Sequence, residues 1–213
     1  MAIEYTGNCY LCGATLGKVA MKNHLFKIHG GAPEESESRL VKVEGSYNKE
    51  YWLYVDIPME DTLEDIDSFL RNIWLECCGH MSAFFYPRYD EIDMDRELGS
   101  FPTGDKFLHH YDFGDTTETV ITIMGSIRRE KKLKGVRLLA RNVPPVFQCS
   151  KCGKTADHIS TVTYDEFYCE ECGKDKIDEG IMLPITNSPR IGVCGYGGEN
   201  DTFTFDPLPF AKK

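Results

Sequence analysis

Four cysteines in two matched pairs form the arrangement in this sequence that best suits metal chemistry. Two residues separate the cysteines within each pair and sixteen separate the pairs, which gives the set Cys149, Cys152, Cys169 and Cys172. Thiolates at this spacing can converge on one tetrahedral zinc ion. Protein would fill all four positions, so the ion is predicted to stabilise a fold and not to bind a substrate. A redox dithiol, the alternative, normally uses a single pair.

A second candidate metal site lies near the amino terminus. Its predicted ligands are Cys9, Cys12, His24 and His29. Residues 9–29 resemble a zinc finger of the two-cysteine, two-histidine class, in which Leu16 and Met21 would form the small apolar core. The gap between the second cysteine and the first histidine is eleven residues, whereas that class usually has about twelve. The sequence therefore predicts two zinc ions per chain, with an altered turn into the finger helix.

Three further cysteines lie outside these two sets. Cys77, Cys78 and Cys194, together with His80, have the right donor types for a third four-ligand metal site. Cys77 also falls on the apolar stripe of a predicted helix, where a simple core position is the alternative. The sequence leaves both interpretations open.

The segment from His109 to Asp115 is dense in groups that bind metals or move protons. A metal-dependent enzyme centred on His80 and this segment is therefore one hypothesis. No nucleophile–base pair can be assigned to the segment, however. The simpler prediction is a structural turn in which the Asp115 side chain accepts hydrogen bonds from backbone amides.

Charge is unevenly distributed along the chain. The net charge is −10, yet residues 127–141 hold seven basic residues and one acid. Such a strip can bind the phosphates of DNA or RNA; the alternative is a solvated strand and turn whose lysines discourage edge pairing. The candidate nucleic-acid-binding residues are Arg128, Arg129, Lys131, Lys132, Lys134 and Arg137.

Composition places the chain among folded proteins of a reducing compartment. Hydrophobic residues make up 41% of the sequence, which favours a globular fold over disorder. No apolar run approaches the roughly 20 residues of a membrane span, and the amino terminus lacks the features of a signal peptide. Nine cysteines without an export signal favour metal-bound thiolates over disulfides, so we expect a cytoplasmic protein.

Hydrophobic periodicity predicts one main helix among several strands. Apolar residues recur at helical spacing from Leu63 to Cys77, with Asp61 or Thr62 as the amino-terminal cap and Gly79 as the stop. Alternation predicts a strand over 50–58 with Tyr51, Leu53, Val55 and Ile57 on one face. Further strands are predicted at 81–87, 106–112, 117–126 and 136–143.

Two stretches of the chain, FLRNIWLECCGHMSAFF (69–85) and HHYDFGDTTETVI (109–121), resemble the plasmid ORF-three-like family. The resemblance spans roughly residues 45–145 and implies an α+β domain with an antiparallel sheet and no settled biochemical activity. Many relatives place a tryptophan and then a histidine after the second stretch, where this chain has Thr117 and Thr119. An activity that needs that histidine is therefore not expected here.

Together these observations predict an α+β fold in which an antiparallel sheet packs against a main amphipathic helix and carries two small zinc modules. The predicted parts are a zinc finger (5–30, the finger), a core domain (40–145), a zinc ribbon (146–176, the ribbon) and an irregular tail (177–213). The first hypothesis for function is a non-enzymatic zinc protein associated with nucleic acid. The alternative is a protein-interaction adaptor that docks partners through its zinc modules, and an enzyme ranks last.

Overall fold

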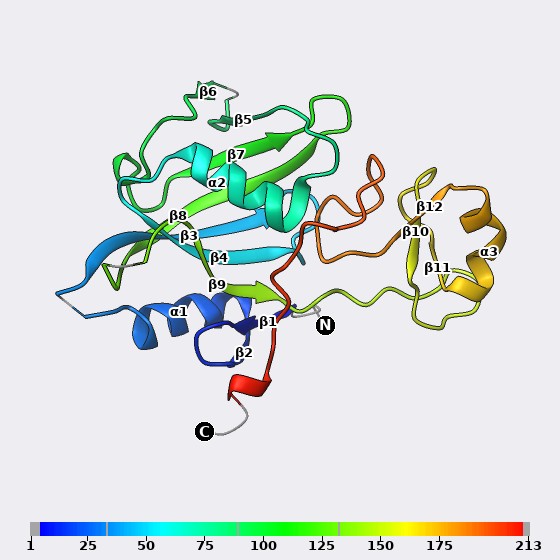
Figure 1. The fold of residues 1–213 in the computed structure, drawn as a ribbon, viewed down its shortest axis with the longest axis horizontal. Coiled ribbons are helices and arrows are strands. Elements are labelled where there is room, and N and C mark those ends of the chain that lie inside the picture. Colours follow the sequence, from blue (N-terminus) through cyan, green and yellow to red (C-terminus); the bar gives the residue numbers. More distant parts are fainter. Residues whose placement is uncertain (1–4, 33, 89, 132, 211–213) are drawn as a thin grey trace.

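The computed structural model describes residues 5–32, 34–88, 90–131 and 133–210. Its main feature is a nine-stranded sheet in the order β2-β1-β9-β4-β3-β8-β7-β5-β6, with every pair of neighbours antiparallel (Figure 1). Its strands are β1 (Thr6–Cys9), β2 (Thr15–Gly17), β3 (Ser36–Gly45), β4 (Trp52–Pro58), β5 (Ser82–Phe85), β6 (Glu91–Ile92), β7 (Lys106–Tyr111), β8 (Thr117–Arg129) and β9 (Arg137–Asn142). The large antiparallel sheet and the mixed α and β content agree with the predicted fold class.

A smaller sheet, in the order β11-β10-β12, combines two strands of the ribbon with β12, a strand of the tail that was predicted to be irregular. Its strands are β10 (His158–Ser160), β11 (Phe167–Tyr168) and β12 (Met182–Pro184). Among the described residues, the helices are α1 (Lys18–Ile28), α2 (Leu63–Leu70) and α3 (Glu170–Asp178), with a π-helical turn at Arg71–Leu75 and 3₁₀ turns at Leu98–Ser100 and Leu208–Phe210. Within the described ranges, no helix is long and apolar enough to cross a membrane.

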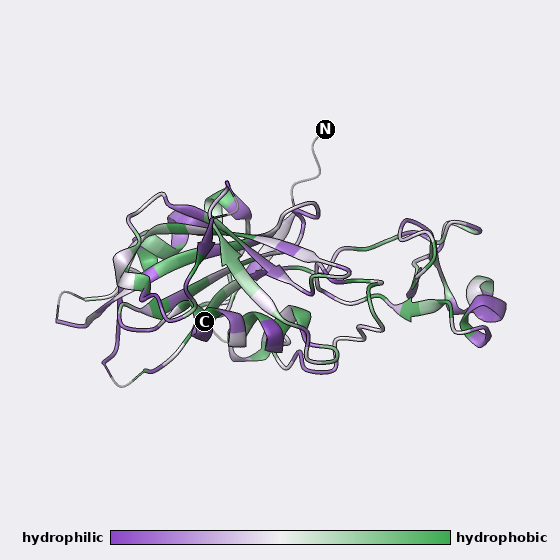
Figure 2. Cartoon of the chain, turned by 90° about the horizontal axis from the view of Figure 1, so that it is seen from above, coloured by the Kyte–Doolittle hydropathy of each residue, from purple (hydrophilic) through white to green (hydrophobic). Residues whose placement is uncertain are grey.

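Two hydrophobic clusters sandwich the centre of the large sheet. The predicted face of β4, with Tyr51 before it, packs into the larger cluster together with α2, which confirms that face. The opposite face of β4 is buried as well, because Trp52 and Tyr54 pack with Met21 and Leu25 of α1. The large sheet and the helices packed on its two faces form the main body of the protein. Figure 2 shows the hydrophobic residues gathered in the sheet of this main body, whereas α3 is mainly hydrophilic. The finger helix thus covers sheet surface that would otherwise face water.

The main helix is shorter than its apolar stripe predicts. Its start agrees with the prediction, since the Asp65 carboxylate accepts hydrogen bonds from the backbone and the hydroxyl of Thr62. The helix then widens into the π-helical turn, in which the Glu76 amide donates to the Arg71 carbonyl, and ends at Leu75. The predicted stop at Gly79 is therefore wrong. Cys77 lies beyond the helix and is half-buried at the edge of the larger cluster.

The finger and the ribbon join the main body differently. Strand β1 pairs with β2 on one side and with β9 on the other, so the finger hairpin forms one edge of the large sheet. The ribbon stands out from the body, with its own sheet and α3 (Figure 1). It touches the larger cluster through Ile159, and Phe147 and Phe167 stack with ring centroids 4.2 Å apart.

Candidate metal centres

The finger brings its four predicted ligands together. Cys9 ends β1, Cys12 lies in the turn, His24 lies on α1 and His29 follows that helix. Their ligand atoms all lie within 4.8 Å of one another, and Cys12 Sγ is 3.2 Å from His24 Nε2. Tetrahedral zinc with metal–ligand distances of about 2.0–2.3 Å separates its ligand atoms by about 3.3–3.8 Å. The donor set and its spacing therefore fit a zinc ion.

Burial makes a cation useful at the finger site. Cys9 has no exposed surface, and burial raises the pKa of its thiol to about 11. Burial also lowers the pKa of His29, which favours the neutral imidazole that binds metal. A metal ion would supply the positive charge that the buried Cys9 thiolate needs.

Packing ties the finger helix to the sheet as well as to the metal site. Met21 and Leu25 are fully buried against the second face of the sheet. At the start of α1, the Tyr54 hydroxyl donates to the Lys18 carbonyl (3.0 Å) and the Lys18 ammonium group pairs with Glu44 (2.7 Å). The inner face of this helix is thus occupied by its own protein.

The ribbon brings its four cysteines to one point. The Cys149 and Cys152 pair precedes β10, and Cys169 and Cys172 lie at the start of α3. All four sulfur atoms lie within 4.8 Å of one another, with 3.8 Å between Cys152 and Cys169. Gly153 adopts φ +72°, a left-handed conformation that closes the turn after the first pair.

Backbone and side-chain hydrogen bonds shift the thiol pKa values of the ribbon cluster in opposite directions. Backbone hydrogen bonds, of which the one involving Cys169 has the largest effect, lower the pKa of the Cys149 thiol to about 6. The pKa of Cys172 is instead raised to about 12, mainly by its hydrogen bond with Cys152. Four neighbouring thiolates repel one another, so they can ionise together only around a cation.

A third set of donors converges beyond the end of the main helix. It consists of Cys77, Cys78, His80 and Cys194, whose ligand atoms also lie within 4.8 Å of one another. The sequence alone leaves open whether Cys77 joins this cluster or occupies a core position. The structure brings all four side chains together at the surface, where Cys78 and Cys194 are exposed.

The segment from His109 to Asp115 is engaged in internal contacts. His109 is fully buried and its Nε2 lies 2.8 Å from Asp67, while His110 pairs with Glu118 at 2.7 Å. The predicted turn is present, but it is the Asp112 carboxylate, and not Asp115, that accepts hydrogen bonds from the amides of Gly114 and Asp115. Asp112 also lies 3.4 Å from His80 Nε2, next to the third cluster.

The basic strip is divided between internal and exposed groups. Arg129 is 3% exposed and, like Arg137, donates to the buried Asp56 carboxylate. Arg128 donates to the Glu35 carbonyl, and the ammonium groups of Lys131 and Lys134 belong to exposed residues. The remaining predicted residue, Lys132, lies outside the described residues.

Two important residues carry little signal in the sequence. Asp56 has no exposed surface and accepts hydrogen bonds from Arg129 and Arg137. Arg190 is fully buried against Asp112, Thr117 and Cys77. The position of Arg190 four residues before Cys194 was the one available hint of its role.

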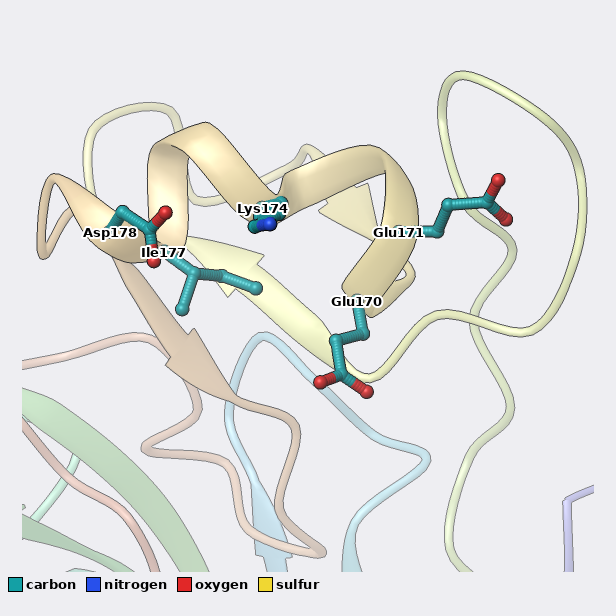
Figure 3. A pocket seen from close by; sticks show the side chains of 5 residues that line it. All are labelled: Glu170, Glu171, Lys174, Ile177 and Asp178. Carbon is teal, nitrogen blue, oxygen red and sulfur yellow. The ribbon is translucent and has the colours of Figure 1, made fainter.

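An acidic groove lies on the surface of the ribbon helix. It has a volume of about 450 Å³ and runs along α3. Figure 3 shows the side chains that line it, which are Glu170, Glu171, Lys174, Ile177 and Asp178. Three carboxylates against one ammonium group give the groove a negative charge around one apolar side chain.

Comparisons with known proteins add little to this geometry. No family model matches the sequence, and no curated protein matches it. One solved structure with some similarity is a protein of unknown function, MM3350, from Methanosarcina mazei Go1. That protein is 16% identical, and the alignment covers 56% of this chain and 76% of that chain with a TM-score of 0.44. A similarity this low carries no argument about the function of this protein.

Proposed function

We propose that the protein is a zinc protein without catalytic activity, in which one ion folds the finger and another folds the ribbon. The observation that carries this proposal is the convergence of four ligand atoms in each module, all within 4.8 Å of one another. Sulfur and imidazole donors in sets of four are typical of structural zinc sites. Protein fills every position, so neither ion would have a position open for a substrate.

Metal analysis of variants tests this proposal. Cys172→Ser and His24→Gln should each lower the zinc content of the purified protein by one ion per chain, because each removes one of four ligands. His158→Gln is the matched control, since this histidine lies at the start of β10 outside the three clusters. Unchanged zinc in both ligand variants would contradict the proposal.

Within this function, the ribbon would serve as a docking surface for a protein partner with basic side chains. The groove along α3 supports this hypothesis because the carboxylates of Glu170, Glu171 and Asp178 line it together with the apolar side chain of Ile177 (Figure 3). A basic segment with one apolar side chain would match both the charge and the apolar centre of the groove. Phosphate groups would be repelled by the same carboxylates.

Nucleic-acid association through the finger and the basic strip has weaker support. Asp56 engages Arg129 and Arg137, and the inner face of the finger helix packs on the sheet. Lys131 and Lys134 remain exposed, and they would give a binding constant that falls steeply with salt. Tight, salt-dependent binding of duplex DNA or RNA would favour this function over protein docking.

A charge-reversal experiment distinguishes the two partner classes. A fluorescent cationic amphipathic peptide serves as the probe, and Glu170→Lys should weaken its binding at least fivefold. Asp165→Lys is the control, because it changes the net charge equally at an exposed position that does not line the groove. Equal binding by the two variants would contradict docking in the groove.

Membership of the plasmid ORF-three-like family also remains a proposal. The two stretches that carry the resemblance meet in space, since His80 of the first lies 3.4 Å from Asp112 of the second. A joint structural role for the two motifs is consistent with this contact.

A further inference from the structure

We propose that Cys77, Cys78, His80 and Cys194 form a third zinc site, which fastens the carboxyl-terminal segment to the main body. The site is separate from those of the finger and the ribbon and does not depend on them. Three thiols and one imidazole are a donor set that selects zinc among the common divalent cations. Their ligand atoms all lie within 4.8 Å of one another.

The separations between these donors suit a tetrahedron around one ion. The sulfur of Cys78 lies 3.6 Å from that of Cys77 and 3.9 Å from that of Cys194. Zinc–sulfur bonds of about 2.3 Å place two sulfurs about 3.8 Å apart. The Nε2 atom of His80 lies closer, 2.9 Å from Cys78 and 3.2 Å from Cys194, and completes the set of four donors.

The backbone conformation of both segments, the loop from Cys78 to His80 and the turn at Cys194, directs the donor side chains toward one point. Gly79 has φ +77°, and its amide donates to the Glu76 carboxylate, which closes the loop between Cys78 and His80. The Arg71 guanidinium donates to the His80 carbonyl at 2.7 Å and so fixes the other side of the loop. Cys194 itself has φ +50°, a conformation uncommon for a residue with a side chain, and ligation would explain why it persists.

A buried arginine supports the site from behind. The Arg190 guanidinium has no exposed surface and donates to Cys77 Sγ (3.5 Å) and to the Asp112 carboxylate (2.8 Å). A donor of this kind stabilises thiolate charge and orients the ligand, as outer partners of metal sites do. Asp112 in turn lies 3.4 Å from His80 Nε2. The hydrogen-bonded pair of Arg190 and Asp112 therefore lies next to two of the four donors, Cys77 and His80.

The cysteine count agrees with a third site. The sequence has nine cysteines, and the finger, the third cluster and the ribbon contain two, three and four of them. Every cysteine therefore belongs to a set of four donors. A disulfide is the rival chemistry, but a bond between Cys78 and Cys194 needs about 2.05 Å between sulfurs, and they are 3.9 Å apart.

The position of the site defines its role. The chain leaves the main body after β9, forms the ribbon and returns at Ser188, whose hydroxyl donates to the Trp74 carbonyl at 2.6 Å. Cys194 then reaches a cluster whose histidine lies 114 positions earlier in the sequence. An ion at this point would hold the returning segment against the end of the main helix.

Zinc analysis of the full chain tests the proposal. We expect three ions per chain in the native protein and two in the double variant Cys78→Ser, Cys194→Ser, whose positions are both exposed and so tolerate substitution. Asn200→Ser, an exposed change in the same tail, is the control and should keep three. Hydrogen exchange of residues 188–196 should become at least tenfold faster in the double variant only.

The outcomes separate this proposal from the proposed function. Two ions in both the native protein and the double variant would overturn the third site and leave the other two intact. A Cys78–Cys194 bridge in freshly purified protein would also overturn it. If Cys172→Ser and His24→Gln leave the zinc content unchanged while the double variant loses one ion, the third site stands and the proposed function fails.

Discussion

Asp56 shows how a buried charge shapes this protein at the level of single residues. Its carboxylate has no exposed surface and accepts hydrogen bonds from Arg129 and Arg137. Arg129 is itself buried and also donates to the Gly135 carbonyl. The cationic residues that the sequence suggests for phosphate binding therefore include two that neutralise an acid inside the fold.

Removing the Asp56 charge should destabilise the chain strongly. Asp56→Ala leaves the Arg129 guanidinium buried without a carboxylate, a change that costs about 3–5 kcal/mol. Urea denaturation followed by tryptophan fluorescence measures the loss. Asp93→Ala, at an exposed position after β6 of the large sheet, should cost less than about 0.5 kcal/mol; equal losses for the two variants would contradict the buried network.

Asp67 should make stability depend on pH in the acid range. Burial acts to raise its pKa, but hydrogen bonds, of which the one with His109 has the largest effect, lower the pKa from 3.8 to about 2. A carboxyl group with a depressed folded-state pKa contributes stability above the unfolded value, so this contribution is lost as the pH falls from about 4 to 2. The expected contribution is about 2 kcal/mol.

Denaturation of native protein and Asp67→Asn from pH 6 to pH 2 checks this effect. The free energy of unfolding of the variant should fall less steeply below pH 4. Both proteins lose zinc as their ligands are protonated, so the difference between the two curves isolates Asp67. Parallel curves would show that Asp67 is not the titrating group.

At the level of elements, the sequence predicts what local periodicity determines. The strand at β4 and its apolar face follow from alternation, and the start of α2 follows from its capping residues. The end of that helix could not be predicted, because the stripe continues to Cys77 while the π-helical turn ends the helix at Leu75. Likewise, β12 lies in the predicted irregular tail, since a strand of three residues has too little pattern to detect.

The candidate metal sites also differ in whether their ligands are close in sequence or are brought together only by folding. The finger and ribbon ligands are close in sequence, so their spacing alone indicates a shared ion. The third cluster joins Cys194 to His80 across 114 positions, and only the folded chain brings them together. Arg190 and Asp112 likewise become partners through tertiary structure.

The ribbon should unfold by itself when its metal site is broken. It has its own sheet, and its helix α3 begins directly after Cys169 and has an exposed, mainly hydrophilic surface. Cys172→Ser should therefore remove hydrogen-exchange protection from β10, β11 and α3 while β3 and β8 stay protected. Protection that remains in α3, or is lost throughout the sheet, would contradict this independence.

At the level of the whole molecule, the apolar core lies almost entirely in the main body. Two hydrophobic clusters lie on the two faces of one antiparallel sheet, and α1 and α2 cover them. The ribbon has few apolar residues of its own in either cluster, with Ile159 the fully packed one. Metal removal should therefore affect the two parts of the protein unequally.

Chelation provides the test of this inequality. The sequence has two tryptophans, Trp52 and Trp74, and both are fully buried. Trp52 packs with the finger helix and Trp74 lies in the larger cluster, so their fluorescence reports the large sheet with its covering helices and not the ribbon. A strong chelator should remove the ribbon zinc and abolish α3 protection while tryptophan emission stays native. On heating, the chelated protein should then unfold the main body in one cooperative transition, at a temperature lowered by loss of the finger ion, because the finger hairpin pairs with β9. Simultaneous loss of tryptophan emission and ribbon protection on chelation at 25 °C would instead show that the metal ions hold the entire chain together.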